Sequence, residues 1–373
     1  MPSASAPGLT GGAPADSVPA ESLDHVEMTQ SSPVHGRDAV DAPGIDPSNG
    51  ARDEAGIATI LVSAPSVPSA VYGAMREVLA RGYRMRTQYD RRNAQGNFTD
   101  PPSLDVSSAI EILDPYAQPR FPKSSCVEIG KYIAETCWGV KDHRILDQDE
   151  LKRQLAAGTF DETKETYWPY TYHQRLFAYP ASQGRTVNQV ERMLGRLAED
   201  PITRRATAIT LVPEIDQYIT GDLPCLQRIA LRCTEDAHGQ IYLHMHTHWR
   251  SRDLFNAAAD NIIAMTFWQR EWAEALSTKI GRQVRVGRYK DFADSLHIYG
   301  RVLQGVDVEK LVNRWNTLSD SERGYTSEDA RDLMVIPDLE RLLAEDAQWN
   351  FPPAAKEKIT TEMARMRRGE YLP

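Results

Sequence analysis

The pattern of hydrophobic and polar residues separates a polar N-terminal stretch from a long region with regular apolar spacing. Residues 1–55 are rich in Pro, Ser, Ala, Gly and Asp and lack aromatic residues. Such a segment buries too little apolar surface to offset the entropy of ordering, so we expect a disordered tail. Folded structure is expected over residues 56–373, starting at the apolar run of residues 57–62. We find no internal repeat, which favours one domain.

Within residues 56–373, helical and strand-like periodicities alternate irregularly. Apolar residues at helical spacing predict helices over Ser69–Arg81, Cys126–Trp138, Thr186–Ala198, Leu254–Ile280, Val308–Leu318 and Pro353–Arg368. Alternating or β-rich runs predict strands over Leu104–Leu113, Ala206–Val212, Leu226–Cys233 and Gln240–Trp249. The turn residues Asp236 and Gly239 between the last two predict a hairpin. The result is an α+β domain with a mixed sheet and surrounding helices.

Composition narrows the function classes. The chain has 373 residues, 41% of them hydrophobic, and a net charge of -9. An acidic protein lacks the general basic surface that nucleic acids or anionic membranes require, although a few local arginines still suit a small anionic substrate. The four cysteines form no CxxC pair and fit a reducing compartment. No apolar run long enough to cross a membrane and no secretory signal is apparent, so we expect a cytoplasmic protein.

Four short segments carry candidate chemistry. Cys225 follows Pro224 at the mouth of a predicted strand, where a thiolate can act as a nucleophile, although a lone cysteine is more often a buried core residue. Arg204 and Arg205 offer adjacent forked donors to a phosphate; a solvated charge pair is the simpler interpretation.

The other two segments flank the long predicted helix of residues 254–280. Arg250, Ser251 and Asp253 precede it, and donors at a helix N-terminus suit phosphate. Asp253 on its own is equally a helix N-cap. His297 and Tyr299 are two residues apart and share one face of a strand, which suits hydrogen bonds to a sugar hydroxyl.

A histidine stripe offers an alternative chemistry. His244, His246 and His248 alternate along one predicted strand and share a face, as the ligands of a zinc or copper site can. No carboxylate or cysteine cluster completes the coordination sphere, so we expect no metal.

Taken in order, these segments resemble the thymidylate synthase family, from about Asp90 to Tyr299. Cys225 is similar to the nucleophile, and Arg250–Asp253 to the Arg-Ser-x-Asp phosphate motif. Asn261 is similar to the pyrimidine-reading asparagine, and Glu135, in a Glu-x-x-Trp segment, is similar to the catalytic glutamate. Tyr170 has the family's spacing from Arg175, and the pair Arg204 and Arg205 is similar to the family's arginine pair. The Asp294–Tyr299 segment, with His297 and Tyr299, and the N-terminal arginine loop, with Arg91 or Arg92, complete the resemblance. We assign Arg92 to the last position and leave Arg91 open.

The resemblance implies a thymidylate-synthase-like fold and a homodimer built through the sheet, with Arg204 and Arg205 reaching the partner's phosphate site. It also implies a pyrimidine nucleoside 5'-monophosphate as substrate and 5,10-methylenetetrahydrofolate as co-substrate, with no metal. Cys225, Glu135 and Tyr170 are the catalytic residues, and Cys225 adds to C6 so that C5 attacks the one-carbon unit.

The product and the base are inferred from smaller differences between this sequence and the motifs of the family. The family's folate-side tryptophans have no clear counterpart, with Phe160 and Trp168 as candidates, and the chain ends in Glu370–Pro373 rather than an apolar closing segment. A weaker screen against water favours hydroxymethylation, with 5-hydroxymethyl-dUMP as the expected product. Thymidylate synthase activity is the alternative.

Asn261 favours uracil, because an amide matches both N3–H and O4, while the adjacent Asp260 keeps dCMP or CMP open. Ribose and deoxyribose are not distinguished. A non-catalytic nucleotide- or RNA-binding relative and a cysteine hydrolase are the remaining alternatives, because a fold does not fix a function.

Overall fold

The computed structural model describes residues 56–123, 128–161, 168–181, 184–219 and 223–373. All of them belong to one compact unit, residues 40–373. The predicted tail of residues 1–55 lies outside the described residues, as does Cys126.

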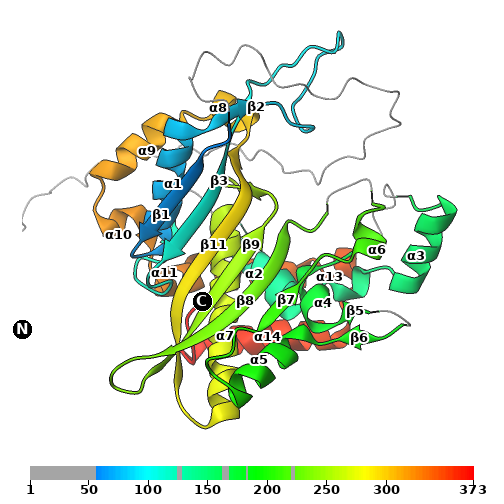
Figure 1. Ribbon diagram of the computed structural model, residues 1–373, viewed down its shortest axis with the longest axis vertical. Helices are drawn as coiled ribbons and strands as arrows, with labels where there is room; N and C mark the ends of the chain where they lie inside the picture. The colour runs from blue at the N-terminus through cyan, green and yellow to red at the C-terminus, as the bar shows by residue number, and fades with distance from the viewer. Residues whose placement is uncertain (1–55, 124–127, 162–167, 182–183, 220–222) are drawn as a thin grey trace, which may run out of the picture. The chain divides into compact units, whose positions relative to one another are not determined.

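A mixed β-sheet organises this unit (Figure 1). Its strands run in the order β1-β3-β11-β9-β8-β7, with β2 beside β3 and β10 beside β11. Their bounds are β1 Thr59–Ala64, β2 Tyr83–Met85, β3 Ser103–Ile112, β7 Thr207–Ile209, β8 Leu226–Glu235, β9 Ile241–Trp249, β10 Arg252–Asp253 and β11 Val284–Ile298. Strand pairs β1/β3, β9/β11 and β10/β11 are parallel, and the others are antiparallel.

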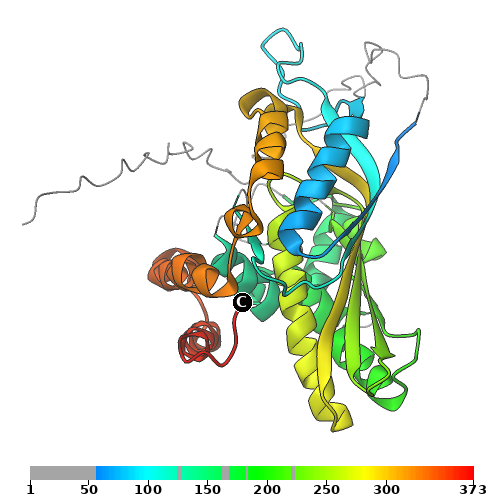
Figure 2. The same cartoon turned by 90° about the vertical axis from the view of Figure 1, so that its left-hand side faces the viewer.

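Helices pack against one face of the sheet (Figure 2). The longer ones are α1 Val67–Arg81, α2 Ile129–Trp138, α3 Gln148–Ala157, α5 Gln189–Glu199, α7 Ala258–Ile280, α9 Val308–Thr317, α12 Ile336–Ala344 and α14 Pro353–Arg367. The shorter ones are η1 Asp142–Arg144, α4 Tyr172–Phe177, α6 Pro213–Asp216, α8 Gly300–Gly305, α10 Asp320–Arg323, α11 Ser327–Ala330, η2 Arg331–Val335 and α13 Asp346–Trp349. Two small ribbons, β4 Phe121–Pro122 with β12 Gly324–Tyr325 and β5 Tyr179–Pro180 with β6 Thr186–Val187, complete the description.

The core lies between the sheet and the helices α1, α2 and α7. Residues 262–269 of α7 are buried without interruption, so this helix is covered on all sides, as expected for a central helix. Burial alternates along β9, where Leu243, Met245 and Trp249 belong to the core. The period of two leaves His244, His246 and His248 on the opposite face.

That opposite face carries a row of laterally paired side chains across six strands, and we call it the outer face. The row consists of Leu61, Ala109, Phe292, His248, Arg228 and Ile209. Leu61, Phe292 and Ile209 are exposed. Apolar side chains in a row on a sheet face are typical of a surface that another chain covers.

The α+β expectation is confirmed, with a mixed sheet and surrounding helices. The predicted hairpin is present, because β8 and β9 pair antiparallel around Asp236 and Gly239. The prediction was wrong at the start of the long helix, since α7 begins at Ala258 rather than Leu254. Asp253 there accepts from the N–H groups of Phe255 and Asn256, which form a separate turn before the helix.

Patterns in the last third of the chain were less informative. The helices between α9 and α14 were not predicted; all of them except α12 are no longer than five residues, too short for a periodic pattern. Among the helices of the described residues, none has the length and apolar character that crossing a bilayer requires.

Candidate active site

Cys225 lies immediately before β8, beside the end of β9. The N–H of Arg250 donates to the carbonyl oxygen of Cys225 over 2.8 Å, and the Arg250 guanidinium donates to the carbonyl oxygen of Leu223 over 2.6 Å. Cys225 is partly buried and is not in a disulfide. The antiparallel pairing of β8 and β9 thus brings together the predicted nucleophile and the predicted phosphate-binding arginine.

Two tyrosines lie next to this junction. The hydroxyl of Tyr172 accepts a hydrogen bond from the N–H of Leu226, the residue after Cys225, over 3.2 Å. Burial raises the pKa of Tyr172 well above its usual value, and the charges of Tyr170 and Cys225 nearby raise it further. The Tyr170 ring lies 5.9 Å from that of Tyr172. The predicted proton-handling Tyr170 is therefore close to the nucleophile's strand, and Tyr172 is a neighbour that the sequence did not indicate.

Arg175, whose spacing identified Tyr170, has a structural partner. Its guanidinium forms an ion pair with Asp216 over 2.7 Å, and both side chains are fully buried. The guanidinium carbon of Arg175 lies 5.4 Å from the centre of the Tyr170 ring. This ion pair holds α4 against α6 and orients Tyr170.

Glu135 lies on α2 and forms an ion pair with Lys141. Lys141 is buried, and its Nζ lies 3.5 Å from the centre of the Trp349 ring and 5.3 Å from that of Trp168. Burial lowers the pKa of Lys141, while the Glu135 carboxylate opposes that shift. Trp168 was one of the two predicted folate-side candidates.

Lys141 and Trp349 were missed in the sequence. Trp349 belongs to α13, far along the chain from Glu135, and only the packing of α13 against α2 and η1 brings them together. The Glu-x-x-Trp segment ends three residues before Lys141, and no motif includes this lysine.

Asn261 is held between two side chains. Its amide nitrogen donates to the hydroxyl of Tyr132, and its side-chain oxygen accepts from Arg252 over 3.5 Å. Tyr132 is on α2, one turn before Glu135, and α2 packs against α4, the helix that begins at Tyr172. The predicted pyrimidine-reading residue therefore lies next to both α2 and α4.

Arg252, the third residue of the predicted phosphate motif, points into the core. It forms an ion pair with Asp291 over 3.0 Å, and its Nη2 donates to the carbonyl oxygen of Ala258 over 3.1 Å. Ser251 is partly exposed and lies between Arg250 and Arg252. The two arginines of the motif therefore have different roles: the Arg250 guanidinium bonds to Leu223, two residues before the cysteine, and Arg252 anchors β10 to α7.

His297 and Tyr299 are together, as predicted. Their ring centres are 4.5 Å apart, but Tyr299 lies one residue beyond the end of β11. His297 is buried, which lowers its pKa, while the charge of Asp253 on β10 opposes the shift. Tyr89, from the segment between β2 and β3, packs edge-on against Tyr299 with ring centres 5.9 Å apart.

The predicted phosphate arginines differ in their surroundings. Arg204 and Arg205 are exposed just before β7. Arg92 stacks on Phe98, with its guanidinium carbon 3.9 Å from the ring centre, while Arg91 forms an ion pair with Asp100 over 2.6 Å. Asp100 is almost fully buried, so Arg91 has a fixed partner within its own loop.

The histidines of the stripe have separate partners. His244 Nε2 lies 2.8 Å from the hydroxyl of Thr234, and its Nδ1 accepts from the N–H of Arg288. His248 Nε2 lies 2.9 Å from a carboxylate oxygen of Asp294. Among the described residues, no group of three or more potential metal ligands forms.

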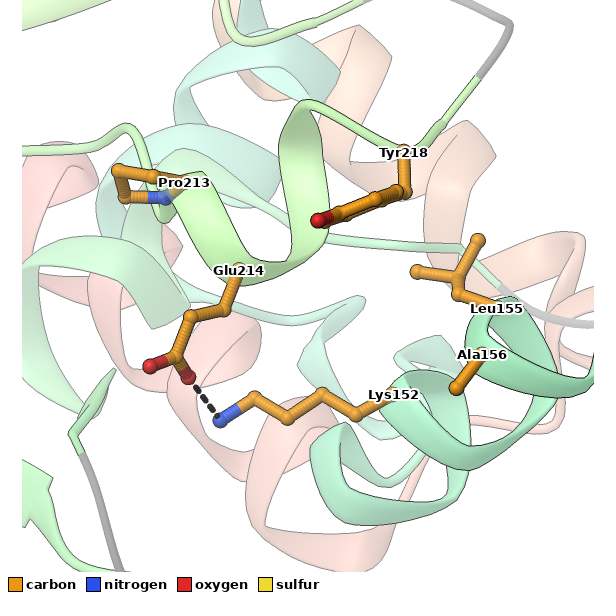
Figure 3. Close-up of a pocket in the computed structure, with 6 residues that line it drawn as sticks. All are labelled: Lys152, Leu155, Ala156, Pro213, Glu214 and Tyr218. Carbon is orange, nitrogen blue, oxygen red and sulfur yellow. Dashed lines mark ion pairs between the residues drawn. The ribbon is translucent and has the colours of Figure 1, made fainter.

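A separate pocket of about 660 Å³ opens between α3 and α6 (Figure 3). It is lined by Lys152, Leu155, Ala156, Pro213, Glu214 and Tyr218. An ion pair between Lys152 and Glu214, 3.0 Å long, crosses it. None of its lining residues is among the predicted site residues.

Sequence comparison is consistent with this arrangement. No protein-family model matches the chain. A protein of Methanocaldococcus jannaschii named "Putative thymidylate synthase" is 27% identical over 244 residues, which are 64% of this chain and 90% of that protein. A protein of the same name from Methanosarcina mazei is 28% identical over 166 residues, or 44% of this chain and 65% of that protein.

A structural neighbour was also found. Thermostable thymidylate synthase A from Bacillus subtilis superposes with a TM-score of 0.47 and 17% sequence identity, covering 66% of this chain and 84% of that one. The matches in sequence, together with the order of the site residues, relate this chain to the thymidylate synthase family.

Proposed function

We propose that this protein transfers a one-carbon unit from 5,10-methylenetetrahydrofolate to C5 of a uracil nucleoside 5'-monophosphate, with a 5-hydroxymethyl product. The observation that carries the proposal is the junction of β8 and β9, where the N–H of Arg250 bonds to the carbonyl oxygen of Cys225. The Arg250 guanidinium bonds to the carbonyl oxygen of Leu223, two residues before Cys225, so a thiol nucleophile and a group suited to phosphate belong to adjacent chain segments, as a nucleotide substrate requires.

Each residue at and near this junction has a role in the proposed reaction. Cys225 adds as a thiolate to C6 of the base, and C5 becomes a carbon nucleophile. Arg250 binds the phosphate, and Tyr170 and Glu135 move protons to and from the base. C5 attacks the one-carbon unit and loses its proton, the bond from that carbon to the folate nitrogen breaks with release of tetrahydrofolate, and water adds to the carbon to give the hydroxymethyl group. Elimination of the Cys225 thiolate from C6 then returns the enzyme to its starting state.

The residues around Glu135 fit a folate. The co-substrate supplies a one-carbon unit at the oxidation level of formaldehyde. Its pterin is a flat ring, and Trp168 and Trp349 offer aromatic faces close to Lys141. Lys141 in turn holds the Glu135 carboxylate at this location.

The same ion pair supports hydroxymethylation over methylation. A buried lysine beside a carboxylate keeps this part of the site polar, and polar buried groups retain water. Water is the nucleophile that a hydroxymethyl product requires, whereas hydride transfer requires its exclusion. Asn261, with both ends of its amide held, supports the uracil assignment.

The protein is also proposed to act as a homodimer through the outer face. The exposed Leu61, Phe292 and Ile209 support this, because burial of such a row favours association. Arg204 and Arg205 are exposed next to β7 and are available to reach a second subunit. Sedimentation of the purified protein would give the oligomeric state directly.

The test of the reaction is release of tritium from C5-tritiated nucleotides in the presence of the folate, with product mass and dihydrofolate absorbance followed in parallel. We expect tritium release, a hydroxymethyl product and little dihydrofolate. Dihydrofolate in equal amount to a methyl product would identify a thymidylate synthase instead. No tritium release from any pyrimidine nucleotide would favour the non-catalytic alternative.

A further inference from the structure

Next to the predicted sugar-binding pair lies an acidic residue that no motif includes. Asp105 on β3 is directly opposite His297 on β11 in the antiparallel register. Side chains in such a position share a face of the sheet and are neighbours. Both are 5% exposed.

A serine ties the two together. The hydroxyl of Ser295 donates to Oδ2 of Asp105, and it lies 3.1 Å from Nδ1 of His297. The second oxygen of the Asp105 carboxylate and the second nitrogen of the His297 imidazole take no part in these contacts. Among the described residues, neither Oδ1 of Asp105 nor Nε2 of His297 has a hydrogen-bond partner, although both atoms are buried.

Two buried polar atoms without partners carry a cost that a ligand can remove. A buried donor or acceptor left unpaired costs about 1–3 kcal/mol, so such atoms usually have a partner in the working state. A carboxylate oxygen only accepts hydrogen bonds, and a neutral imidazole nitrogen donates or accepts according to its tautomer. Because the Ser295 hydroxyl gives its one proton to Asp105, Nδ1 of His297 carries the ring proton in their contact, and Nε2 of the neutral imidazole is an acceptor. Each of the two acceptors then needs its own O–H, so two hydroxyls on adjacent carbons satisfy both atoms, whereas one hydroxyl has a single proton and satisfies only one.

We propose that Asp105 accepts a hydrogen bond from the 2'-hydroxyl of ribose, and that the substrate is a ribonucleoside 5'-monophosphate. This rests on the proposed function, in which His297 and Tyr299 bind the sugar. Asp105 extends that pair by one strand across the sheet. It replaces the dUMP of the sequence-based expectation with UMP.

Burial raises the pKa of the Asp105 carboxyl to about 6, and the Ser295 hydroxyl opposes that shift. Assays at pH 8 therefore keep it ionised and able to accept. A structural role is the competing explanation, because Ser295 lies in the irregular part of β11 between Ala293 and Leu296, and Asp105 braces it.

The experiment compares ribo- and deoxyribonucleotides carrying the same base. Tritium release is measured at pH 8 with the pairs UMP/dUMP and CMP/dCMP, so that an error in the base does not hide the sugar preference. We expect kcat/KM for the ribonucleotide to exceed that for the deoxyribonucleotide by about 100-fold or more, since a site built for a hydroxyl discriminates strongly against its absence.

Two variants distinguish recognition of the sugar by Asp105 from a structural role in which Asp105 only supports Ser295. Asp105→Asn keeps an oxygen for Ser295 and loses the negative charge, and we expect about a tenfold or greater loss with the ribonucleotide and about threefold or less with the deoxyribonucleotide. Glu111→Gln is the matched control on the same strand, because Glu111 pairs with Arg288 and Lys290 on the outer face. It should leave the sugar ratio unchanged.

Equal use of both sugars by the wild-type protein overturns the assignment, and this comparison needs no variant to fold. Equal losses with both sugars in Asp105→Asn also overturn it, in favour of the brace. In either case tritium release still supports the proposed reaction. If no nucleotide releases tritium, calorimetric binding of UMP and dUMP tests the sugar alone: a preference for UMP that Asp105→Asn removes supports the assignment, and equal affinities overturn it.

Discussion

Arg252 and Asp291 form an ion pair that is closed to solvent, with 3.0 Å between Nη2 and Oδ2 and side-chain exposures of 1% and 0%. Asp291 also accepts from the hydroxyl of Tyr289 over 2.9 Å, and the guanidinium carbon of Arg252 lies 4.1 Å from the centre of the Trp249 ring. The pair joins β10 to β11 beneath the strand end that carries Cys225. An arginine from a predicted phosphate motif thus holds the framework of the site.

We therefore expect Arg252→Ala to lower the free energy of unfolding by about 3–5 kcal/mol, because it leaves the Asp291 carboxylate buried and unpaired. Urea denaturation measures the change. Arg282→Ala is the control, since the exposed pair of Arg282 and Glu235 should contribute about 1 kcal/mol or less. Similar small losses in both variants would contradict the structural role of Arg252.

Replacement of Cys225 tests the nucleophile. Cys225→Ala should abolish tritium release while nucleotide affinity stays within about tenfold, or roughly 1.4 kcal/mol, because the arginines hold the phosphate. Cys233→Ala is the control: it is a partly buried cysteine on β8 whose pKa burial raises to about 11. Substantial turnover by Cys225→Ala would exclude covalent catalysis by this residue.

Asn261→Asp tests the choice of base. A carboxylate has no donor for O4 of uracil, so we expect the preference to move toward cytosine nucleotides by about 1–3 kcal/mol in kcat/KM. The new carboxylate would lie beside Arg252, which already bonds to the Asn261 oxygen. The ratio of kcat/KM for UMP and CMP is the measurement. An unchanged ratio would remove Asn261 from base recognition.

The shared site is tested with mixed dimers. We expect two inactive proteins, Arg205→Ala and Cys225→Ala, to recover tritium release when their subunits are exchanged, because one of the two sites then combines an intact cysteine with an intact arginine. Cys225→Ala mixed with Cys225→Ser should remain inactive and serves as the control. No recovery, with subunit exchange verified, would mean that Arg205 acts within its own chain.

His246 should make stability depend on pH. Burial, followed by the charge of Lys290, lowers its pKa to about 4, whereas an unfolded chain has the ordinary value of about 6.5. Between these values the unfolded state binds a proton that the folded state does not, so stability falls as the pH falls. Urea denaturation at several pH values should show a smaller decline in His246→Asn than in the wild type. The exposed His238→Asn should follow the wild type, and identical slopes for all three would contradict the prediction.

Most of the local structure followed from the sequence. Helices α1, α5, α9 and α14 and the β8–β9 hairpin agree with the predicted segments to within a few residues, because their apolar residues repeat with the period of a helix or a strand. The order of the seven motif segments along the chain, those of Cys225, Arg250 and His297–Tyr299 among them, was likewise sufficient to indicate the family.

Contacts between distant segments were beyond reach of the sequence. Lys141 meets Trp349 only through the packing of α13 near the end of α2, and Asp105 meets His297 only through the register of β3 on β11. Periodicity describes which face of an element is buried, but not which residue of another element lies against it. The sequence by itself therefore determined the elements and the types of the reacting groups. Tertiary packing alone decided that the Arg250 guanidinium bonds to Leu223, two residues before the cysteine, while Arg252 is buried against Asp291, because Arg250 lies between β9 and β10 and Arg252 begins β10, and only the assembled sheet determines which partner each side chain meets.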